Sequence, residues 1–299
     1  MYDLIIIGGG PAGLSAAVYA ARFNLKAIVI SELIGGYMME SPQICNYPSY
    51  TIINGVELTN NMKEQVKSLN IEMIEEEVVK VEKTKEKEFL VKTKSNKEFK
   101  SKTILLAVGT KKRKLNIKGE EDFAGKGISY CATCDGPLFK DKIVAVVGGS
   151  NSAAVSALLL SQFAKEVHIF YRKQKLRADP YWTEKIDKAK NIKVHYNMVL
   201  EEIKGEKIVK KIKTDDGKEM EVGGVFIEIG SIPSTALPKS LGVKLDDKDC
   251  IIVDKTQKTN IDGIYAAGDI TTGSNKMRQI VTACAEGAVA AESTYNSLK

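Results

Sequence analysis

The first residues of the chain follow the patterns of a strand, a turn and a helix. Residues 2–7 are almost all apolar and rich in isoleucine, which predicts a buried strand. The glycine-rich segment 8–13 predicts a tight turn, and the alanine-rich segment 14–23 predicts a helix. A second apolar run at 27–30 completes a strand, a helix and a strand, which together predict a βαβ unit.

The same pattern starts again near the middle of the chain. Residues 142–147 predict a strand, 148–153 a glycine-containing turn and 166–171 the next strand, with a helix between them. Two βαβ units in one chain predict an α/β fold with two dinucleotide-type domains. Further strands are expected at 78–81, 89–93, 99–100, 103–108, 193–196, 208–214, 225–229 and 264–267, helices at 57–69 and 278–293, and linkers at 111–119 and 230–233.

Size and composition are those of a globular protein with two domains. The chain has 299 residues, 43% hydrophobic and 27% charged, and about 150 residues is an ordinary domain length. No apolar run reaches the ~18 residues of a membrane span, and the N-terminus lacks a basic segment, so we expect a cytoplasmic protein without signal peptide or membrane contact. The net charge of +6 is modest, and the basic run 111–114 has no interleaved aromatic residues, so we expect no nucleic-acid partner.

Five cysteines are the main candidates for chemistry. A zinc site needs a second pair of cysteines or histidines at ligand spacing, and the only histidines, His168 and His195, adjoin none of the cysteines, so we expect no metal. Two cysteines are spaced as C-x-x-C, at Cys131 and Cys134, which in a cytosolic protein indicates a redox-active disulfide. The other three are expected only to pack in the structure: Cys45, Cys250 and Cys284.

The first glycine-rich turn has the spacing of a dinucleotide-binding site. Gly8 suits the tight turn, Gly10 lets a pyrophosphate approach the backbone, and Gly13 lets the helix pack on the strand. Glu32 follows the second strand, where an acidic side chain binds ribose hydroxyls. The strand, the helix and the acid together predict a bound dinucleotide cofactor.

The second turn departs from this pattern. Ser150 takes the place of the middle glycine, where its side chain intrudes on the space of a pyrophosphate. Overpacking by a small group costs about 1–3 kcal/mol, which weakens binding about 5- to 150-fold. Three cations that suit the 2′-phosphate of NADPH follow the next strand: Arg172, Lys173 and Arg177.

Five motifs occur in the order typical of low-molecular-weight thioredoxin reductases, and they span nearly the whole chain. They are residues 8–13, Asn46-Tyr47-Pro48, the run from Cys131 to Asp135, Gly268-Asp269 and Arg278-Gln279. The chain therefore resembles that family. Relatives of this superfamily that reduce ferredoxin lack the cysteine pair, so its presence argues against that branch.

The resemblance implies two Rossmann-like, doubly wound, three-layer domains, the second inserted in the first. The FAD-binding domain would comprise 1–112 and 243–299, and the inserted domain, 113–242, would carry the pyridine-nucleotide site and the disulfide. It also implies a homodimer in which the inserted domain swivels, so that the disulfide faces the flavin in one position and thioredoxin in the other.

The resemblance further implies roles for individual residues. Asp269 would bond the ribitol chain of FAD, and Arg278-Gln279 would lie near its isoalloxazine ring. Cys134 would contact the flavin and attack thioredoxin, Cys131 would resolve the mixed disulfide, and Asp135 would protonate the leaving thiol. The set expected at FAD is Gly8, Gly10, Pro11, Ala12, Gly13, Glu32, Gly36, Asn46, Gly109, Asp269, Arg278 and Gln279. The set expected at NADPH is Gly148, Ser150, Asn151, Ser152, Arg172, Lys173 and Arg177.

The electron donor stays open between two alternatives. The family shows His-Arg-Arg, three residues and then Arg; Arg172 and Arg177 match this motif, whereas Tyr171 and Lys173 do not. Lysine keeps the charge but loses the bidentate geometry of arginine. We expect NADPH as the donor, with reduced ferredoxin as the alternative. The expected acceptor is thioredoxin or a thioredoxin-like protein, a peroxiredoxin or another small disulfide protein is a second option, and a non-catalytic, redox-sensing flavoprotein is a third hypothesis.

Overall fold

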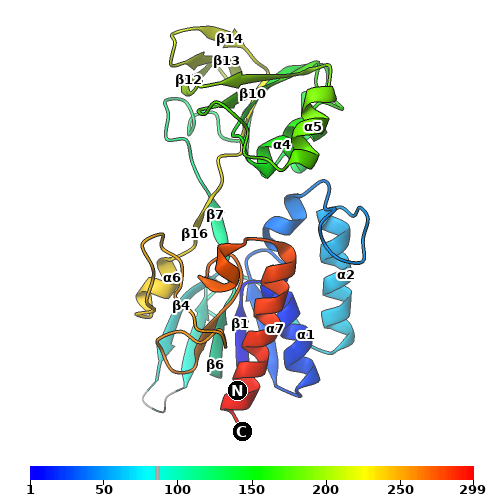
Figure 1. Cartoon of the computed structure of the whole chain (residues 1–299). Helices are drawn as coiled ribbons and strands as arrows, with labels where there is room; N and C mark the ends of the chain where they lie inside the picture. The colour runs from blue at the N-terminus through cyan, green and yellow to red at the C-terminus, as the bar shows by residue number, and fades with distance from the viewer. Residues whose placement is uncertain (85, 87) are drawn as a thin grey trace. The chain divides into compact units, whose positions relative to one another are not determined.

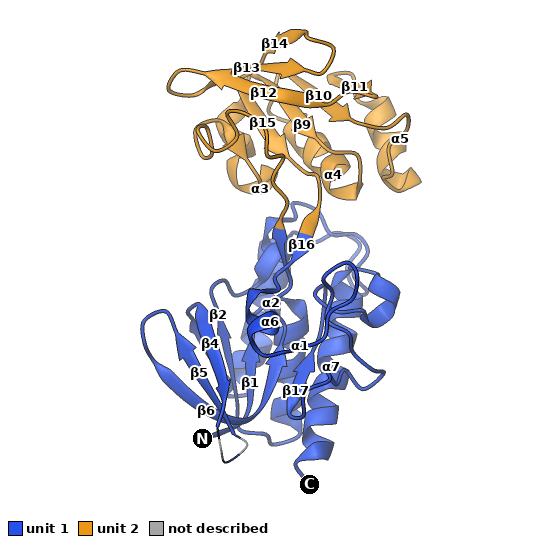
Figure 2. Cartoon of the chain, turned by 90° about the vertical axis from the view of Figure 1, so that its left-hand side faces the viewer, with its two compact units in different colours: residues 1–111, 232–299 blue, residues 112–231 orange. Residues whose placement is uncertain are grey.

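The structure is a computed structural model that describes every residue of the chain except 85 and 87. It divides into two compact units (Figure 2): unit 1 comprises Met1–Lys111 and Ile232–Lys299, and unit 2 comprises Lys112–Ser231. Unit 2 is therefore inserted in the sequence of unit 1. Each unit contains a parallel sheet with helices, which confirms the predicted α/β fold class.

Unit 1 is built on a seven-stranded sheet (Figure 1). The path β3-β2-β1-β6-β5-β4 is parallel from β3 to β6 and antiparallel from β6 to β4, and β17 pairs with β6 in parallel. The strands are β1 (Tyr2–Ile7), β2 (Ala27–Ser31), β3 (Glu72–Glu75), β4 (Val78–Lys83), β5 (Phe89–Thr93), β6 (Glu98–Leu106) and β17 (Ile264–Ala266).

Strand β6 runs without a break where the pattern predicted two strands, at 99–100 and 103–108. Ser101 is fully buried in its middle, and its hydroxyl donates to the carbonyl oxygen of Thr103 at 2.6 Å. Because a hydroxyl can be satisfied by nearby backbone, a polar residue interrupts the apolar pattern here without interrupting the strand.

The sheet of unit 1 is covered on both faces. Leu4 and Ile6 pack with helices α1, α2 and α7, whereas Ile5 and Ile7 pack into a second core with β4, β5 and the segment around Ile251. This is the alternation that a strand imposes on its side chains. The helices are α1 (Pro11–Arg22), α2 (Gly55–Ser68), α6 (Ala236–Ser240) and α7 (Ile280–Ser297), with 3-10 turns η1 (Gly36–Glu40) and η3 (Gly273–Lys276).

Side-chain capping determines where two helices of unit 1 begin. Asn54 accepts a hydrogen bond from the Glu57 amide at 2.8 Å, so α2 begins earlier than the predicted residue 57. Gln279 and Thr282 form a capping box, so α7 begins later than the predicted residue 278. The apolar pattern alone could not locate these starts, because the caps are polar.

Unit 2 contains a five-stranded parallel sheet in the order β11-β10-β9-β15-β8. A three-stranded antiparallel sheet, β12-β13-β14, shares a core with it that includes Phe170, Leu200 and Val225. Figure 2 shows α3, α4 and α5 on the opposite side of the parallel sheet. The elements are β8 (Ile128–Ser129), β9 (Ile143–Val147), β10 (Glu166–Tyr171), β11 (Ile192–Tyr196), β12 (Leu200–Gly205), β13 (Val209–Thr214), β14 (Glu219–Glu221), β15 (Gly224–Ile227), α3 (Ala132–Asp135), η2 (Gly136–Phe139), α4 (Asn151–Leu160) and α5 (Pro180–Lys188).

The chain leaves unit 1 and returns to it through two short strands that pair with each other, β7 (Thr110–Lys112) and β16 (Ser231–Pro233). The second boundary falls between residues 231 and 232, whereas the family resemblance put it between 242 and 243. Leu237 and Leu241 explain the difference, because both pack against the core of unit 1. The linker signal at 230–233 marks the boundary of the structure.

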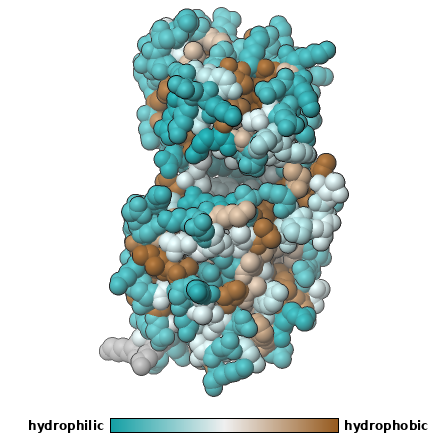
Figure 3. Space-filling view, in the orientation of Figure 1, coloured by the Kyte–Doolittle hydropathy of each residue, from teal (hydrophilic) through white to brown (hydrophobic). Residues whose placement is uncertain are grey.

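The molecular surface is mostly hydrophilic in the view of Figure 3, with apolar side chains scattered over both units. Among the residues that the structure describes, no helix is long and apolar enough to cross a membrane.

The two histidines of the chain lie side by side on β10 and β11. His168 Nδ1 and His195 Nε2 are 2.9 Å apart, and His195 also stacks on Phe170 with ring centroids 4.7 Å apart. Glu166 contacts His168 Nε2 at 3.1 Å and accepts from Lys193 Nζ at 2.7 Å. Burial lowers the pKa of His195, and the adjacent His168 and Lys193 lower it further.

We predict that this pair makes the protein less stable as the pH falls from about 7.5 to about 5.5. The pKa of His195 is lower in the folded protein than in the unfolded chain, where it is about 6.5, so the unfolded chain takes up the proton first. Urea midpoints at the two pH values measure the loss. His195→Phe keeps a ring against Phe170 without a titrating group, so its midpoint should fall less. An equal fall in both proteins would contradict the prediction.

Candidate active site and cofactor sites

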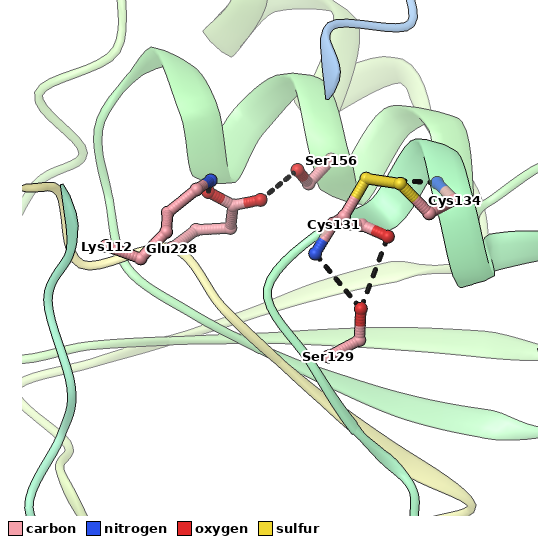
Figure 4. Close-up of a disulfide and its surroundings, with 6 residues drawn as sticks. All are labelled: Lys112, Ser129, Cys131, Cys134, Ser156 and Glu228. Carbon is pink, nitrogen blue, oxygen red and sulfur yellow. Dashed lines mark hydrogen bonds and ion pairs between the residues drawn. A yellow bond between two sulfur atoms is a disulfide. The ribbon is translucent and has the colours of Figure 1, made fainter. Parts of the chain in front are cut away.

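Cys131 and Cys134 form a disulfide in unit 2, with their Cα atoms 5.3 Å apart (Figure 4). Cys131 is the N-cap of α3, and its sulfur accepts a hydrogen bond from the Cys134 amide at 3.1 Å. Ser129 fixes the preceding turn, because its hydroxyl accepts from Cys131 N at 3.0 Å and donates to Cys131 O at 3.2 Å. Sequence reasoning did not single out Ser129, although a serine two residues before such a motif suits this kind of turn.

The two cysteines differ in accessibility. Cys134 is exposed, whereas Cys131 is half-buried, so an incoming thiol or disulfide reaches Cys134 more readily. Once the disulfide is open, the Cys134 amide can stabilise a thiolate on Cys131, because a hydrogen bond to the charged form favours it. Asp135 is half-buried and forms no hydrogen bond or ion pair through its carboxylate with the described residues. Its carboxylate is therefore available for proton transfer.

The first glycine-rich turn has the geometry that a dinucleotide site requires. Gly8 has φ +110°, and a Cβ there would lie 2.2 Å from the carbonyl oxygen of Ala107. A Cβ on Gly13 would lie 1.9 Å from Gly8 O, so only glycine lets α1 start this close to β1. A Cβ on Gly10 would meet no atom within 4 Å, and Gly36 faces the same space. That open space is the room a pyrophosphate needs.

A cavity of about 600 Å³ lies beside this turn within unit 1. Glu32, directly after β2, lines it together with Gly8, Val78 and Val108. The Glu32 side chain is exposed and forms no hydrogen bond or ion pair with described residues, so it can accept from ribose hydroxyls. The lining also includes the charged residues Glu77 and Lys111, and a mixed polar and apolar lining with a carboxylate beside the turn suits an adenosine group. The residues of unit 1 therefore fit the adenosine and pyrophosphate part of FAD.

Asp269 follows β17 and is supported by a residue that the sequence pattern did not reveal. Burial raises the pKa of Asp269, Arg278 opposes this shift, and Glu286 adds to it. Glu286, buried in α7, accepts hydrogen bonds from Gly268 N at 2.8 Å and Thr271 Oγ1 at 2.9 Å. Glu286 thereby fixes the turn that presents Asp269. The signal in the sequence was an acidic residue among the small apolar residues of a helix.

The other residues of the expected FAD set lie apart in the sequence, and the structure brings some of them together. Asn46 Nδ2 donates to Gln279 Oε1 at 2.9 Å, although 233 residues separate them. Arg278 contacts a thiol, with Nη2 3.5 Å from the sulfur of Cys250. Gly109, with φ +58°, leaves β6 in a conformation that favours glycine.

The three remaining cysteines are not joined in disulfides: Cys45 and Cys284 are half-buried and Cys250 is buried. Burial raises the pKa of the Cys284 thiol to about 11, with a hydrogen bond from Tyr47 opposing the shift. The Cys284 sulfur lies 3.7 Å from the carbonyl oxygen of Pro11, which with Ala12 forms the first turn of α1. A thiol with a raised pKa reacts slowly, since only the thiolate is a nucleophile.

The second glycine-rich turn has a backbone conformation like that of the first turn but carries different side chains. Gly148 has φ +145°, and a Cβ on Gly149 would lie 2.4 Å from the ring of Tyr171, which packs against the turn. Ser150 is the N-cap of α4 and has the extended backbone of Gly10, with no capping hydrogen bond from its side chain. The Ser150 side chain thus extends from the position that is open at Gly10.

The cations expected near the second turn lie in the loop after β10. Arg172, Lys173 and Arg177 are exposed, and none forms an ion pair with the described residues. Asn151 and Ser152 form the first turn of α4. Lys175 in the same loop is exposed as well, so the loop can offer these three positive charges and a fourth to an anionic ligand.

Comparison with known proteins agrees with this geometry. The family model for pyridine nucleotide-disulphide oxidoreductase matches residues 2–287. A thioredoxin reductase from Listeria innocua is 38% identical over 98% of this chain and 92% of the relative. The crystal structure of Lactococcus lactis thioredoxin reductase matches with a TM-score of 0.93 and 37% identity, over 99% of this chain and 98% of that one. A ferredoxin-flavin thioredoxin reductase from Clostridium acetobutylicum is 33% identical with a TM-score of 0.53, over 99% of this chain and 98% of that one.

We predict that Glu286→Ala lowers both FAD content and stability. The change leaves the Gly268 amide without its acceptor, at about 1–3 kcal/mol, whereas the Thr271 hydroxyl keeps the carbonyl oxygen of Gly268 at 3.0 Å as an acceptor. The ratio of flavin to protein absorbance and urea denaturation measure the two effects. Glu286→Gln keeps an acceptor oxygen and should lie between the alanine variant and the unchanged protein. Glu292→Ala, at an exposed position of the same helix, is the control. An alanine variant with normal flavin content and midpoint would rule out this role.

Proposed function

Because the chain belongs to the pyridine nucleotide-disulphide oxidoreductase family and is a FAD-dependent disulfide oxidoreductase of the thioredoxin reductase type, we propose that it passes electrons from NADPH through FAD and the Cys131–Cys134 disulfide to thioredoxin. The observation that carries the proposal is the accessible disulfide in unit 2. In this proposal unit 1 is the FAD-binding domain, and unit 2 binds the pyridine nucleotide and carries the disulfide.

Residues of unit 1 would hold FAD, which when bound accepts two electrons from the donor and supplies them to the disulfide. The turn 8–13 admits the pyrophosphate, and Glu32 accepts from the ribose hydroxyls. Asp269, held in place by Glu286, bonds the ribitol chain. Arg278, the Asn46–Gln279 pair and the turns at Gly36 and Gly109 complete the site. The open space at Gly10 and the absence of a hydrogen bond or ion pair between Glu32 and the described residues support this assignment.

The disulfide carries the electrons to the protein acceptor. Two electrons break the bond between Cys131 and Cys134 and leave two reduced sulfurs. Cys134, the exposed cysteine, attacks the disulfide of thioredoxin and forms a mixed disulfide with one of its sulfurs, while the other sulfur leaves and takes a proton from Asp135. Cys131, as a thiolate stabilised by the Cys134 amide, then attacks Cys134. This step re-forms the disulfide and releases thioredoxin with both of its sulfurs reduced.

The acceptor in this proposal is a protein. Leu138, in η2 directly after the disulfide, is 71% exposed, and it provides an apolar contact next to the reactive sulfur. Thioredoxin is the proposed partner because the relatives are thioredoxin reductases. Action as a homodimer and in the cytoplasm belongs to the same proposal and rests on the family resemblance.

NADPH is the proposed donor because Arg172, Lys173 and Arg177 are exposed and unpaired within the described part of the chain. Three cations on one loop suit a 2′-phosphate. One observation favours reduced ferredoxin as a second candidate, namely the Ser150 side chain at the position that must be open for a pyrophosphate. The relative from Clostridium acetobutylicum is a ferredoxin-flavin enzyme by its description. We place NADPH before reduced ferredoxin because the loop after β10 is positively charged.

We predict that excess NADPH bleaches the visible absorbance of the bound flavin in the absence of oxygen. Each NADPH delivers two electrons, so the flavin and the disulfide together should consume about two equivalents. Dithionite in a parallel sample gives the absorbance of the fully reduced protein. Bleaching by reduced ferredoxin, with none by excess NADPH, would replace NADPH by ferredoxin as the donor, and bleaching by dithionite alone would rule out NADPH without supporting ferredoxin.

We predict that Cys131→Ser, through Cys134, forms a stable mixed disulfide with a thioredoxin variant that keeps one cysteine of its pair, activated as the thionitrobenzoate disulfide, and that Cys134→Ser forms far less. Cys134 attacks the activated sulfur and thionitrobenzoate leaves; with neither Cys131 nor the second thioredoxin cysteine present, no thiol resolves the adduct. Non-reducing electrophoresis followed by mass spectrometry identifies the linked cysteine. Cys45→Ser, which keeps the pair, is the control. Absence of an adduct in both pair variants would favour the non-catalytic redox sensor, and an adduct with a peroxiredoxin alone would replace thioredoxin as the acceptor.

A further inference from the structure

The loop 172–179 of unit 2 is attached to the second glycine-rich turn by two hydrogen bonds between Asn151 and Asp179, one between their side chains and one from the Asp179 backbone amide. Asn151 Nδ2 donates to Asp179 Oδ2 at 2.8 Å, and the Asp179 amide donates to Asn151 Oδ1 at 2.7 Å. The amide of Arg177 donates to the carbonyl oxygen of Gly149 at 2.6 Å, which attaches the same loop at a second point. Both ends of this contact lie within unit 2.

Neither side chain does what its position in the helix would suggest. Asp179 is the N-cap of α5, yet its carboxylate makes no capping hydrogen bond. Asn151 is the first residue of α4, where a polar side chain can face a bound anion. Both side chains bind each other instead. Because Asn151 and Asp179 bind each other, the pair holds the start of α4 and the start of α5 together.

The position of the pair matters because of what the loop carries. Arg172, Lys173 and Arg177 all lie between the end of β10 and Asp179, and all three are exposed. Their positions relative to Gly149 depend on how the loop is attached to the turn. A phosphate is recognised by cations placed at defined distances from the pyrophosphate site, so attachment of the loop affects recognition of the 2′-phosphate.

We propose that the Asn151–Asp179 pair is a positioning device that determines the preference for NADPH over NADH. The proposal rests on the proposed function, since it presumes a pyridine nucleotide at this turn. Asp179 acts through the loop cations and does not bind the nucleotide. Its negative charge alone would repel a phosphate, so removal of Asp179 has opposite effects under the two interpretations. A positioning role predicts weaker binding of NADPH, and mere repulsion predicts tighter binding.

The test compares Asp179→Ala, Asp179→Asn and the unchanged protein in steady-state reduction of thioredoxin with NADPH or NADH. Asp179→Ala removes the hydrogen bond from Asn151 Nδ2 to Asp179 Oδ2 and keeps the one from the amide of residue 179, so it should raise the KM for NADPH about threefold to tenfold, the range that loss of one hydrogen bond produces. The KM for NADH and both kcat values should change by less than about twofold, since NADH has no 2′-phosphate. Asp179→Asn keeps an acceptor for Asn151 Nδ2 and should restore the low KM. Asp187→Ala, at an exposed position of α5, removes one negative charge without touching the pair and is the matched control.

The outcomes separate this proposal from the proposed function. An Asp179→Ala variant with the KM values of the unchanged protein, or with a lower KM for NADPH, would overturn the positioning role alone. An equal rise with NADPH and NADH would also overturn it, because it would show general damage to the turn. If the unchanged protein takes no electrons from either nucleotide but reduces thioredoxin with dithionite, the donor assignment fails, and this proposal fails with it.

Discussion

Both units depend on one steric constraint: the first strand of the βαβ unit must turn into a helix while the backbone approaches other backbone closely. In unit 1 a Cβ on Gly13 would lie 1.9 Å from Gly8 O, so the sixth position of the turn must be glycine. In unit 2 that position is Ala153, which is fully buried. The first position is glycine in both turns, because a Cβ on Gly8 or on Gly148 would lie 2.2 Å from a backbone carbonyl oxygen. The two turns therefore share the constraint at the first position and differ at the middle position, Gly10 against Ser150, and at the sixth.

This difference has a chemical consequence at the middle position of each turn. Gly10 and Ser150 share an extended backbone at the start of a helix, and only at Gly10 is the side-chain direction open. The first turn can thus place helix amides against a pyrophosphate, whereas the second must do so beside a hydroxymethyl group. In the proposed function, nucleotide binding at the second turn would therefore rely more on the charged loop after β10. Because the Ser150 side chain leaves less room for a pyrophosphate, the positions of the charges in the loop would matter more for binding.

Sequence patterns predicted what is local in this fold. The runs at 2–7 and 142–147 identified β1 and β9, because a buried parallel strand is apolar on both faces. Because of Ser101 the apolar pattern predicted two strands where β6 is one. The buried hydroxyl of Ser101 bonds to neighbouring backbone, and an apolar pattern cannot show such a hydrogen bond. Sequence patterns also could not predict contacts between residues that are far apart in the chain. Glu286 could be seen as an unusual acid in a helix, but its acceptor role depends on Gly268 lying beside α7.

For the same reason, the spacing of the cysteines could identify the redox pair, but only the structure shows how accessible each sulfur is. Spacing selected Cys131 and Cys134 from five cysteines that are chemically identical in the sequence. Burial then raises the pKa of Cys284 to about 11, which keeps it protonated and unreactive near neutral pH. Within the pair, exposure separates the cysteine that can be reached from the one whose sulfur accepts a backbone amide. In the proposed function, Cys134 would be the attacking cysteine because its sulfur is accessible, and Cys131 would be the resolving cysteine because the Cys134 amide would stabilise its thiolate once the disulfide is open. The order of the two steps would then follow from the start of a single helical turn.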